Sequence, residues 1–455
     1  MSPAIPAVSF LACAASGFVL WASFAPSTTK PLATYLALVA LALAFALSPQ
    51  ALALFSPVMG EVRPLVRLEY VAGGCFLGLM GIALLHDEML PPQTGLDVAV
   101  THALPLLGSC GGILALWSSN LMDLGIGIGL YAVARWPKWQ GQKDAEKGMI
   151  PILSSLSILL GTALVYSETA TFDMASLGRF LWQHGEPQSF GLYLGLGLVL
   201  AGISLPTGFI PPFGSFGGEG DSTVSHLLGL MVLLRLGLHL GALAWECFWV
   251  CLSLSLVCLV WGWATALAHT LGDPLGRIWG LLVAQRGFLL LPLAFIFRGQ
   301  NLAPLVTVAV AYALVQGVVR LSLRWLSVIG DVAPSRLLSR TVIKRPMVGV
   351  PLCVGVLSLI GLPPTLGFIV RAELVRLAWT LQLTWLVPVV VTMSILCLWA
   401  FIPLVLPLLG GTGGRADLPP PWPVRIALVL AAISLVALGL FPLPLLQLAD
   451  WLLGV

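Results

Sequence analysis

Charge is scarce in this chain, since only 9% of its 455 residues are Asp, Glu, Lys or Arg. An ordinary soluble domain has about a quarter of its residues charged, and 58% of this chain is hydrophobic. A chain this apolar cannot cover itself with polar surface in water. The net charge of +3 is small and the basic residues are scattered, which argues against a nucleic-acid-binding protein.

Signatures of catalysis and of cofactor binding are also lacking. The glycine-rich run from Ser215 to Asp221 does not contain the GxxxxGK[ST] pattern of a phosphate-binding loop. No Fe–S, haem, flavin or nicotinamide signature occurs, and the eight cysteines form no CxxC pair. Since these cysteines lie in apolar stretches, we interpret them as buried hydrophobic side chains. The sequence therefore predicts no cofactor, no metal site, no catalytic residue and no small-molecule substrate.

Long apolar runs are abundant, and about 20 apolar residues suffice to cross the hydrocarbon core of a bilayer. By this measure the sequence predicts an all-α polytopic membrane protein with about fourteen transmembrane helices. The predicted spans are 5–25, 31–57, 67–85, 97–117, 118–135, 149–167, 189–210, 222–244, 245–270, 278–297, 302–328, 347–378, 382–409 and 423–448. The 48 glycines and 33 prolines favour broken membrane helices over disorder.

The distribution of Lys and Arg predicts the orientation, because these residues accumulate in cytoplasmic loops. With the N-terminus outside, the cytoplasmic loops hold fourteen basic residues: Lys30, Arg135, Lys138, Lys143, Lys147, Arg277, Arg320, Arg324, Arg336, Arg340, Lys344, Arg345, Arg415 and Arg425. The opposite loops hold five: Arg63, Arg67, Arg179, Arg298 and Arg376. This bias predicts that both termini are non-cytoplasmic, in what we expect to be a bacterial inner (plasma) membrane.

Proline and glycine interrupt the seventh and the twelfth predicted spans. The prolines at the two breaks are Pro206, Pro211 and Pro212 in span 7, and Pro363 and Pro364 in span 12. The two spans are five apart, so they cross in opposite directions. We therefore predict one membrane domain, 1–455, with inverted five-helix repeats at 97–244 and 245–409 and peripheral helices at 1–96 and 410–455. Inverted repeats and broken helices are typical of transporters, and two unrelated proline kinks are the alternative.

Three arginines lie well inside predicted spans: Arg235, Arg286 and Arg371. An arginine at the centre of a bilayer costs at least about 2.5 kcal/mol, so each must face a cavity or a partner. His239 lies one turn after Arg235 on the same face, where an imidazole can pass protons near neutral pH. His226 faces the opposite way, and a packed, hydrogen-bonded histidine is its alternative role.

Glu373 follows the break of span 12, close to two arginines. Its candidate partners are Arg371 and Arg376, and we leave the choice open here. The candidate ion pathway or gate therefore consists of six residues: Arg235, His239, Arg371, Glu373, Arg286 and His226.

Four segments, in order along the chain, resemble the antiporter-like membrane subunits of respiratory complex I and their hydrogenase and Mrp-antiporter relatives. They are GTALVYSETATFD (161–173), TVSHLLGLMVLLRLGLHL (223–240), DPLGRIWGLLVAQRGFLLL (273–291) and LSLIGLPPTLGFIVR (357–371). The last is the most specific and resembles the broken helix 12 of that family. The length is closest to the N (chain 2) class of subunit. The resemblance implies fourteen helices, outward termini and inverted five-helix repeats.

The chain also departs from the family it resembles. There, a glutamate of helix 5 pairs with a lysine of helix 7, and a lysine of helix 8 leads to a lysine or glutamate of helix 12. Here the corresponding positions are Gly129 or Leu130, Pro206, Arg235 and Arg371. Arginine stays charged, with a pKa above about 12, so it cannot load and release protons as a desolvated lysine does. We therefore predict an incomplete path in the first half, with the two arginines as gates or as anchors for carboxylates.

The resemblance implies a membrane-arm subunit of a complex I-like, redox-driven proton or sodium translocating complex, without redox centres of its own. Such a complex would be an NADH- or ferredoxin-quinone oxidoreductase or of the hydrogenase type. The expected partners are other membrane subunits and lipid. Two alternatives stay open. One is a related assembly that couples ion flow to inorganic carbon uptake or cation antiport, and the other is a degenerate scaffold subunit that does not pump.

Overall fold

The computed structural model describes residues 95–140, 145–184, 189–210, 223–269, 274–300, 302–329, 346–409 and 422–453, together with the isolated residue Val39. Within these ranges every regular element is a helix, and the one exception to helical pairing is an isolated bridge between Asn120 and Asp173. The predicted all-α class is confirmed. Apart from Val39, the first three predicted spans, 5–25, 31–57 and 67–85, lie outside the described residues.

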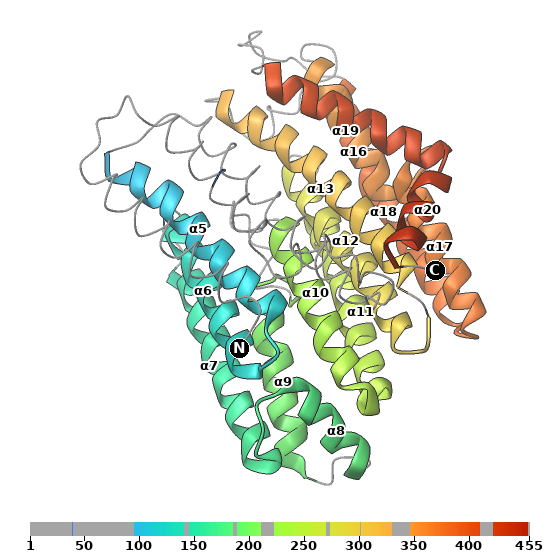
Figure 1. Ribbon diagram of the computed structural model, residues 1–455. Helices are drawn as coiled ribbons and strands as arrows, with labels where there is room; N and C mark the ends of the chain where they lie inside the picture. The colour runs from blue at the N-terminus through green and yellow to red at the C-terminus, as the bar shows by residue number, and fades with distance from the viewer. Residues whose placement is uncertain are drawn as a thin grey trace, which may run out of the picture. The chain divides into compact units, whose positions relative to one another are not determined.

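The chain divides into two compact units after Ala244, the residue at which the two predicted repeats meet. That the two units are related by inversion stays a prediction. The helices of the first unit are α5 (Gly95–Trp117), α6 (Leu121–Gln140), α7 (Ala145–Thr169), α8 (Met174–His184), α9 (Phe190–Ser204), α10 (Thr223–His239) and the 3-10 helix η3 (Gly241–Leu243) (Figure 1).

Glycines set the close packing of the helices in the first unit. A Cβ atom on Gly111 of α5 would lie 2.5 Å from the carbonyl oxygen of Gly127 of α6. A Cβ atom on Gly161 of α7 would lie 2.5 Å from the carbonyl oxygen of Gly195 of α9. Small residues let two backbones approach in this way, and membrane helices use such contacts because lipid gives them no hydrophobic drive to associate.

The seventh predicted span corresponds to α9, which is shorter than predicted because it ends at Ser204. A turn over 205–208 follows, and Pro206 is buried in it. Pro211 and Pro212 lie outside the described residues. Whether the chain continues across the membrane as a broken helix at this point stays a prediction.

The second unit is built around a buried central helix. Its helices are α11 (Ala244–Ala268), α12 (Pro274–Ile296), α13 (Ala303–Ile329), α16 (Pro346–Ile360), α17 (Leu366–Thr380), α18 (Leu386–Leu409), α19 (Trp422–Leu440) and α20 (Leu443–Leu453). All side chains of α12 from 280 to 296 are buried. Helices α13, α16, α17 and α18 pack on it.

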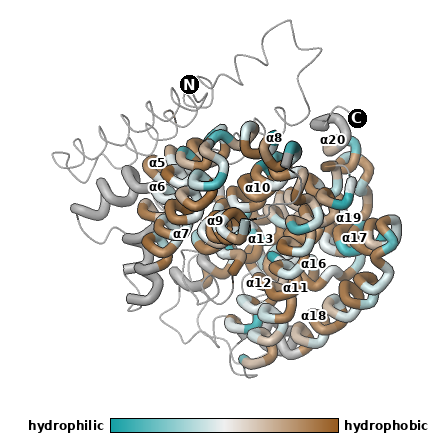
Figure 2. Tube along the Cα trace, turned by 90° about the horizontal axis from the view of Figure 1, so that it is seen from below, coloured by the Kyte–Doolittle hydropathy of each residue, from teal (hydrophilic) through white to brown (hydrophobic). Residues whose placement is uncertain are grey.

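Four helical stretches in the described ranges are long and apolar enough to cross a membrane: Ile150–Thr169, Gly241–Ala268, Leu275–Ile296 and Ala303–Leu323. Helices α19 and α20 form a fifth if this pair, bent by 91°, counts as one span. Hydrophobic residues predominate along the helices of both units (Figure 2). Apolar side chains on the helix surfaces, such as Leu156, Ile395 and Leu430, are each more than half exposed, which suits lipid and not water. The protein is an integral membrane protein, while the count of fourteen spans stays a prediction.

Candidate functional site

Helix α16 ends at a glycine in a left-handed conformation. Gly361 has φ +78°, and its N–H donates to the carbonyl of Ser358 at 3.1 Å. The N–H of Leu362 donates to the carbonyl of Leu357 at 3.2 Å. This pair of bonds is the Schellman motif, which satisfies two of the four carbonyls that a helix leaves over at its C-terminus. The carbonyls of Leu359 and Ile360 are the other two.

Arg371, on the second turn of α17, donates hydrogen bonds to both of these carbonyls. Its Nη2 lies 2.5 Å from the oxygen of Leu359, and its Nη1 donates to the oxygen of Ile360. The side chain is 6% exposed, and its guanidinium carbon lies 4.7 Å from the ring centre of Phe288 on α12. A Cβ atom on Gly361 would lie 2.5 Å from the Cδ atom of Arg371, so residue 361 has no room for a side chain.

A second bond joins the two helices in the opposite direction. The N–H of Gly367, one of the leftover donors in the first turn of α17, donates to the Oγ atom of Ser358 at 3.0 Å. The residues between the helices, 361–365, contain the cis peptide bond between Pro363 and Pro364. A Cβ atom on Gly439 of α19 would lie 2.2 Å from the carbonyl oxygen of Pro364, so α19 packs directly on this connection. That α16 and α17 form one broken membrane span stays a prediction.

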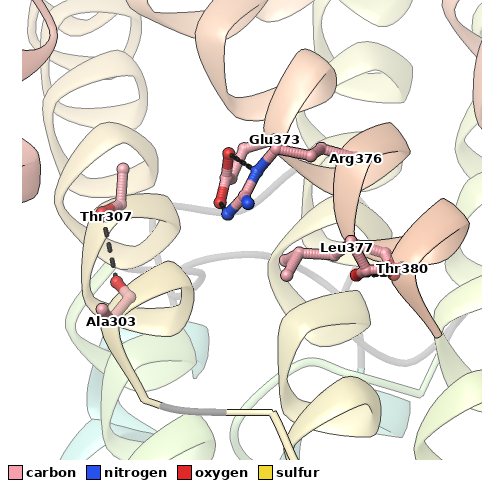
Figure 3. Close-up of polar contacts among 6 residues, drawn as sticks. All are labelled: Ala303, Thr307, Glu373, Arg376, Leu377 and Thr380. Carbon is pink, nitrogen blue, oxygen red and sulfur yellow. Dashed lines mark hydrogen bonds and ion pairs between the residues drawn. The ribbon is translucent and has the colours of Figure 1, made fainter.

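The partner of Glu373 is Arg376 (Figure 3). Its Oε2 atom accepts from Nε of Arg376 at 2.8 Å, and its Oε1 atom accepts from Nη2. Arg376 is exposed, with 63% of its side chain accessible. Arg371 therefore donates to backbone carbonyls at the end of α16, while Glu373 neutralises the other arginine of the helix.

Arg286 is 1% exposed on the central helix α12 of the second unit. A polar stripe on α13, which the sequence reasoning missed, lies in the same unit at Tyr312, Gln316 and Arg320. The Nε2 atom of Gln316 donates to the carbonyl of Leu282 at 3.3 Å, and Nε of Arg320 donates to Oε1 of Gln316 at 2.9 Å. Tyr312, Gln316 and Arg320 are spaced four residues apart, which indicates one face of a helix. The sequence analysis assigned Arg320 to a loop and so did not connect the three.

In the first unit, Arg235 of α10 also donates to a carbonyl at the end of a helix. Its Nη1 donates to the oxygen of Leu116, in the last turn of α5. The Nδ1 atom of His239 lies 2.8 Å from the backbone oxygen of Arg235. A carbonyl only accepts, so Nδ1 of His239 is the donor of this bond. The structure thus brings Arg235 and His239 together, as their spacing predicts.

Helix α8, which the sequence reasoning did not predict, covers the end of α10. A Cβ atom on Gly178 would lie 2.5 Å from the carbonyl oxygen of His239. Asp173 caps the start of α8, because its Oδ2 atom accepts from the N–H of Ser176 at 2.7 Å. Hydrogen bonding by Ser176, aided by the charges of Arg179 and His239, holds the pKa of Asp173 below its usual value.

His226 lies apart from this pair, at the other end of α10. It is fully buried, and its ring centre lies 5.8 Å from that of Phe209. The neighbouring Ser225 Oγ atom lies 2.8 Å from the hydroxyl oxygen of Tyr131 on α6. Nine residues of helix separate His226 from Arg235, or about 13 Å along the axis, so the two do not form one cluster.

Comparison with solved structures places this arrangement in a known fold, although no family model matches the sequence. A chain of the membrane-bound sulfane sulfur reductase (MBS), an archaeal respiratory membrane complex, matches with a TM-score of 0.76 and 16% identity, over 99% of this chain and 96% of that one. A chain of respiratory complex I from Thermus thermophilus matches with a TM-score of 0.69 and 22% identity, over 97% of this chain and 98% of that one. A chain of the Mrp complex from Dietzia sp. DQ12-45-1b matches with a TM-score of 0.67 and 16% identity, over 100% of this chain and 97% of that one.

The chain has the fold of an antiporter-like membrane subunit. At these identities the likeness concerns the fold alone. Within that fold, Arg235 and Arg371 both donate to carbonyl oxygens at the ends of helices.

Proposed function

We propose that this chain is a membrane subunit of a complex I-like, ion-translocating assembly, driven by redox chemistry that takes place in other subunits. The proposal is supported mainly by how much of the chain the structural match covers. At least 97% of the chain matches chains of two respiratory complexes and of an Mrp complex. The translocated ion in this proposal is a proton, with sodium as the alternative. Neighbouring membrane subunits and lipid are the partners.

The proposed chemistry in the first unit depends on His239 and not on Arg235. A guanidinium keeps its proton at every physiological pH, so Arg235 contributes a fixed positive charge. Imidazole side chains can pass protons, and His239 is held in place by the bond between its Nδ1 atom and the carbonyl of Arg235. The positive charge of Arg235 repels cations from this end of α10. We therefore assign His239 the proton exchange and Arg235 the role of a gate.

Proton flux in proteoliposomes that contain the whole complex tests this assignment. We expect His239→Gln to lower the flux several-fold at neutral pH. Arg235→Lys should retain most of the flux, because a lysine keeps the positive charge, and Arg235→Ala should lose coupling. Arg376→Ala is the matched control, since it removes an exposed arginine. Unchanged flux in both His239→Gln and Arg235→Ala would contradict the assignment.

A scaffold subunit is the second candidate, and specific residues favour it. Gly129 or Leu130 and Pro206 stand where the resembled family has the glutamate and lysine of its first half. Under this alternative the chain holds the complex together without conducting ions. A third candidate is an assembly for inorganic carbon uptake or cation antiport. A mass-spectrometric inventory of the purified complex separates them, because Fe–S subunits favour the respiratory proposal and a zinc protein favours carbon uptake.

We also propose fourteen spans in a bacterial inner membrane, with both termini non-cytoplasmic and inverted repeats at 97–244 and 245–409. The bias of Lys and Arg between the two sets of loops supports this topology. Fusions of alkaline phosphatase and of a fluorescent protein to the C-terminus test it. Alkaline phosphatase activity with no fluorescence is expected, and the reverse result would overturn the orientation.

A further inference from the structure

The connection between α16 and α17 has the groups that bind monovalent cations in broken helices. In transporters, the carbonyls of unwound backbone and the C-terminal ends of half-helices coordinate Na⁺. The C-terminus of a helix also carries about half a negative charge. Here α16 ends in the carbonyls of Leu359 and Ile360, which are not used by the Schellman motif of Gly361 and Leu362.

A positive charge already occupies this position, because the guanidinium of Arg371 donates to both carbonyls. It is enclosed on one side by the ring of Phe288, at 4.7 Å, which also favours a cation. On another side it passes over Gly361, where a Cβ atom would lie 2.5 Å from Cδ and 2.6 Å from Nε. The site is therefore shaped around this side chain, which is 6% exposed.

We propose that Arg371 acts as a tethered cation, which fills a latent sodium site at the C-terminus of α16. The native chain then binds no metal ion between α16 and α17, and a translocated cation must pass elsewhere. Removal of the guanidinium uncovers the two carbonyl oxygens, and a partly hydrated Na⁺ takes its place. This inference concerns binding only, so it stands or falls separately from the proposed function.

Thermal unfolding of the full-length protein in mild detergent tests the proposal. The native protein, Arg371→Ala, Arg371→Lys and the control Arg376→Ala are each measured in choline chloride and in sodium chloride of equal ionic strength. For Arg371→Ala we expect a lower Tm than the native protein in choline, and a rise of about 3 °C or more in sodium. The native protein, Arg371→Lys and Arg376→Ala should show no difference between the two salts.

Two results would overturn the proposal. One is a folded Arg371→Ala protein with the same Tm in both salts, and the other is a sodium-specific rise in the native protein that Arg371→Ala loses. Folding of Arg371→Ala in sodium but not in choline would support it. If Arg371→Ala folds in neither salt, the Tm of Arg371→Gln in the two salts is compared instead. Its neutral amide still donates to one carbonyl but supplies no positive charge, so a sodium ion can still be bound.

Discussion

The two units use an arginine at the end of a helix in different ways. In the second unit, Arg371 is buried and closes the connection between α16 and α17 through two carbonyls of one helix. In the first unit, Arg235 is half-buried, binds the end of α5, and offers its own carbonyl to the ring of His239. The same residue type therefore fixes the backbone between two helices in one unit and orients a histidine side chain in the other.

The largest expected effect is a difference in stability between Arg371→Gln and Arg235→Gln. Glutamine cannot span both carbonyls at the end of α16, so at least one buried acceptor loses its donor, at a cost of about 1–3 kcal/mol. Arg235 is half-buried, so the loss of its bond to the carbonyl of Leu116 should carry a smaller desolvation cost. Thermal unfolding in detergent should show a larger loss of Tm for Arg371→Gln. An equal loss of Tm in both variants would mean that the two arginines contribute equally to stability.

A pair of glycine substitutions sharpens the account of Arg371. Gly361 and Gly299 both have positive φ, +78° and +89°, so an alanine at either position costs about 1–2 kcal/mol of backbone strain. A Cβ atom at Gly299 meets nothing within 4 Å, whereas at Gly361 it overlaps Arg371. Gly361→Ala should therefore cost about 1–3 kcal/mol more than Gly299→Ala in thermal unfolding. Similar losses would show that Arg371 moves aside easily.

The smallest expected effect concerns α8, which covers the end of α10 in the first unit. Asp173→Ala removes the N-cap of α8 and should cost about 1 kcal/mol. The pKa of Asp173 is lowered in the folded protein, so its contribution is present above the unfolded value of 3.8 and is lost as the pH falls through the folded value.

Limited proteolysis of the 174–184 segment, followed between pH 3 and pH 6, measures this loss. Cleavage should increase at the acid end for the native protein and at all pH values for Asp173→Ala. Arg179→Ala is the control, because it removes a nearby charge and leaves the cap. A native protein whose cleavage does not change over this range would show that the cap of α8 does not depend on the charge of Asp173.

The long apolar helices could be predicted from the sequence because apolar length alone defines them. The predicted spans 245–270 and 302–328 agree with α11 (Ala244–Ala268) and α13 (Ala303–Ile329) within two residues. The sequence predicts one span over 423–448, whereas the structure has two helices there, α19 and α20, which meet at a bend of 91° near Pro442. Helix α8 was missed because its 11 residues are too few for a membrane span.

The candidate site was predictable in its charged residues but not in their acceptors. The acceptors of Arg371 and Arg235 are backbone carbonyls, which every residue has, so no pattern of side-chain types identifies them. The sequence analysis left the partner of Glu373 undecided between Arg371 and Arg376, although helix geometry favours one of them. Residues three apart lie side by side on a helix and residues two apart do not, which favours Arg376 over Arg371.

The hydrogen bonds of the two arginines also differ in the length of chain that they close. Those of Arg371 join residues 11 and 12 positions apart, whereas that of Arg235 joins residues 119 positions apart. Short loops close with little loss of entropy and contribute to fast folding. At a synthesis rate of about 5–20 residues per second, the acceptors of Arg371 precede it by about 0.6–2.4 s and that of Arg235 by roughly 6–24 s. The connection between α16 and α17 can therefore close almost as soon as Arg371 is synthesised. The bond at the end of α5 cannot form until Arg235, near the end of the first unit, has been synthesised.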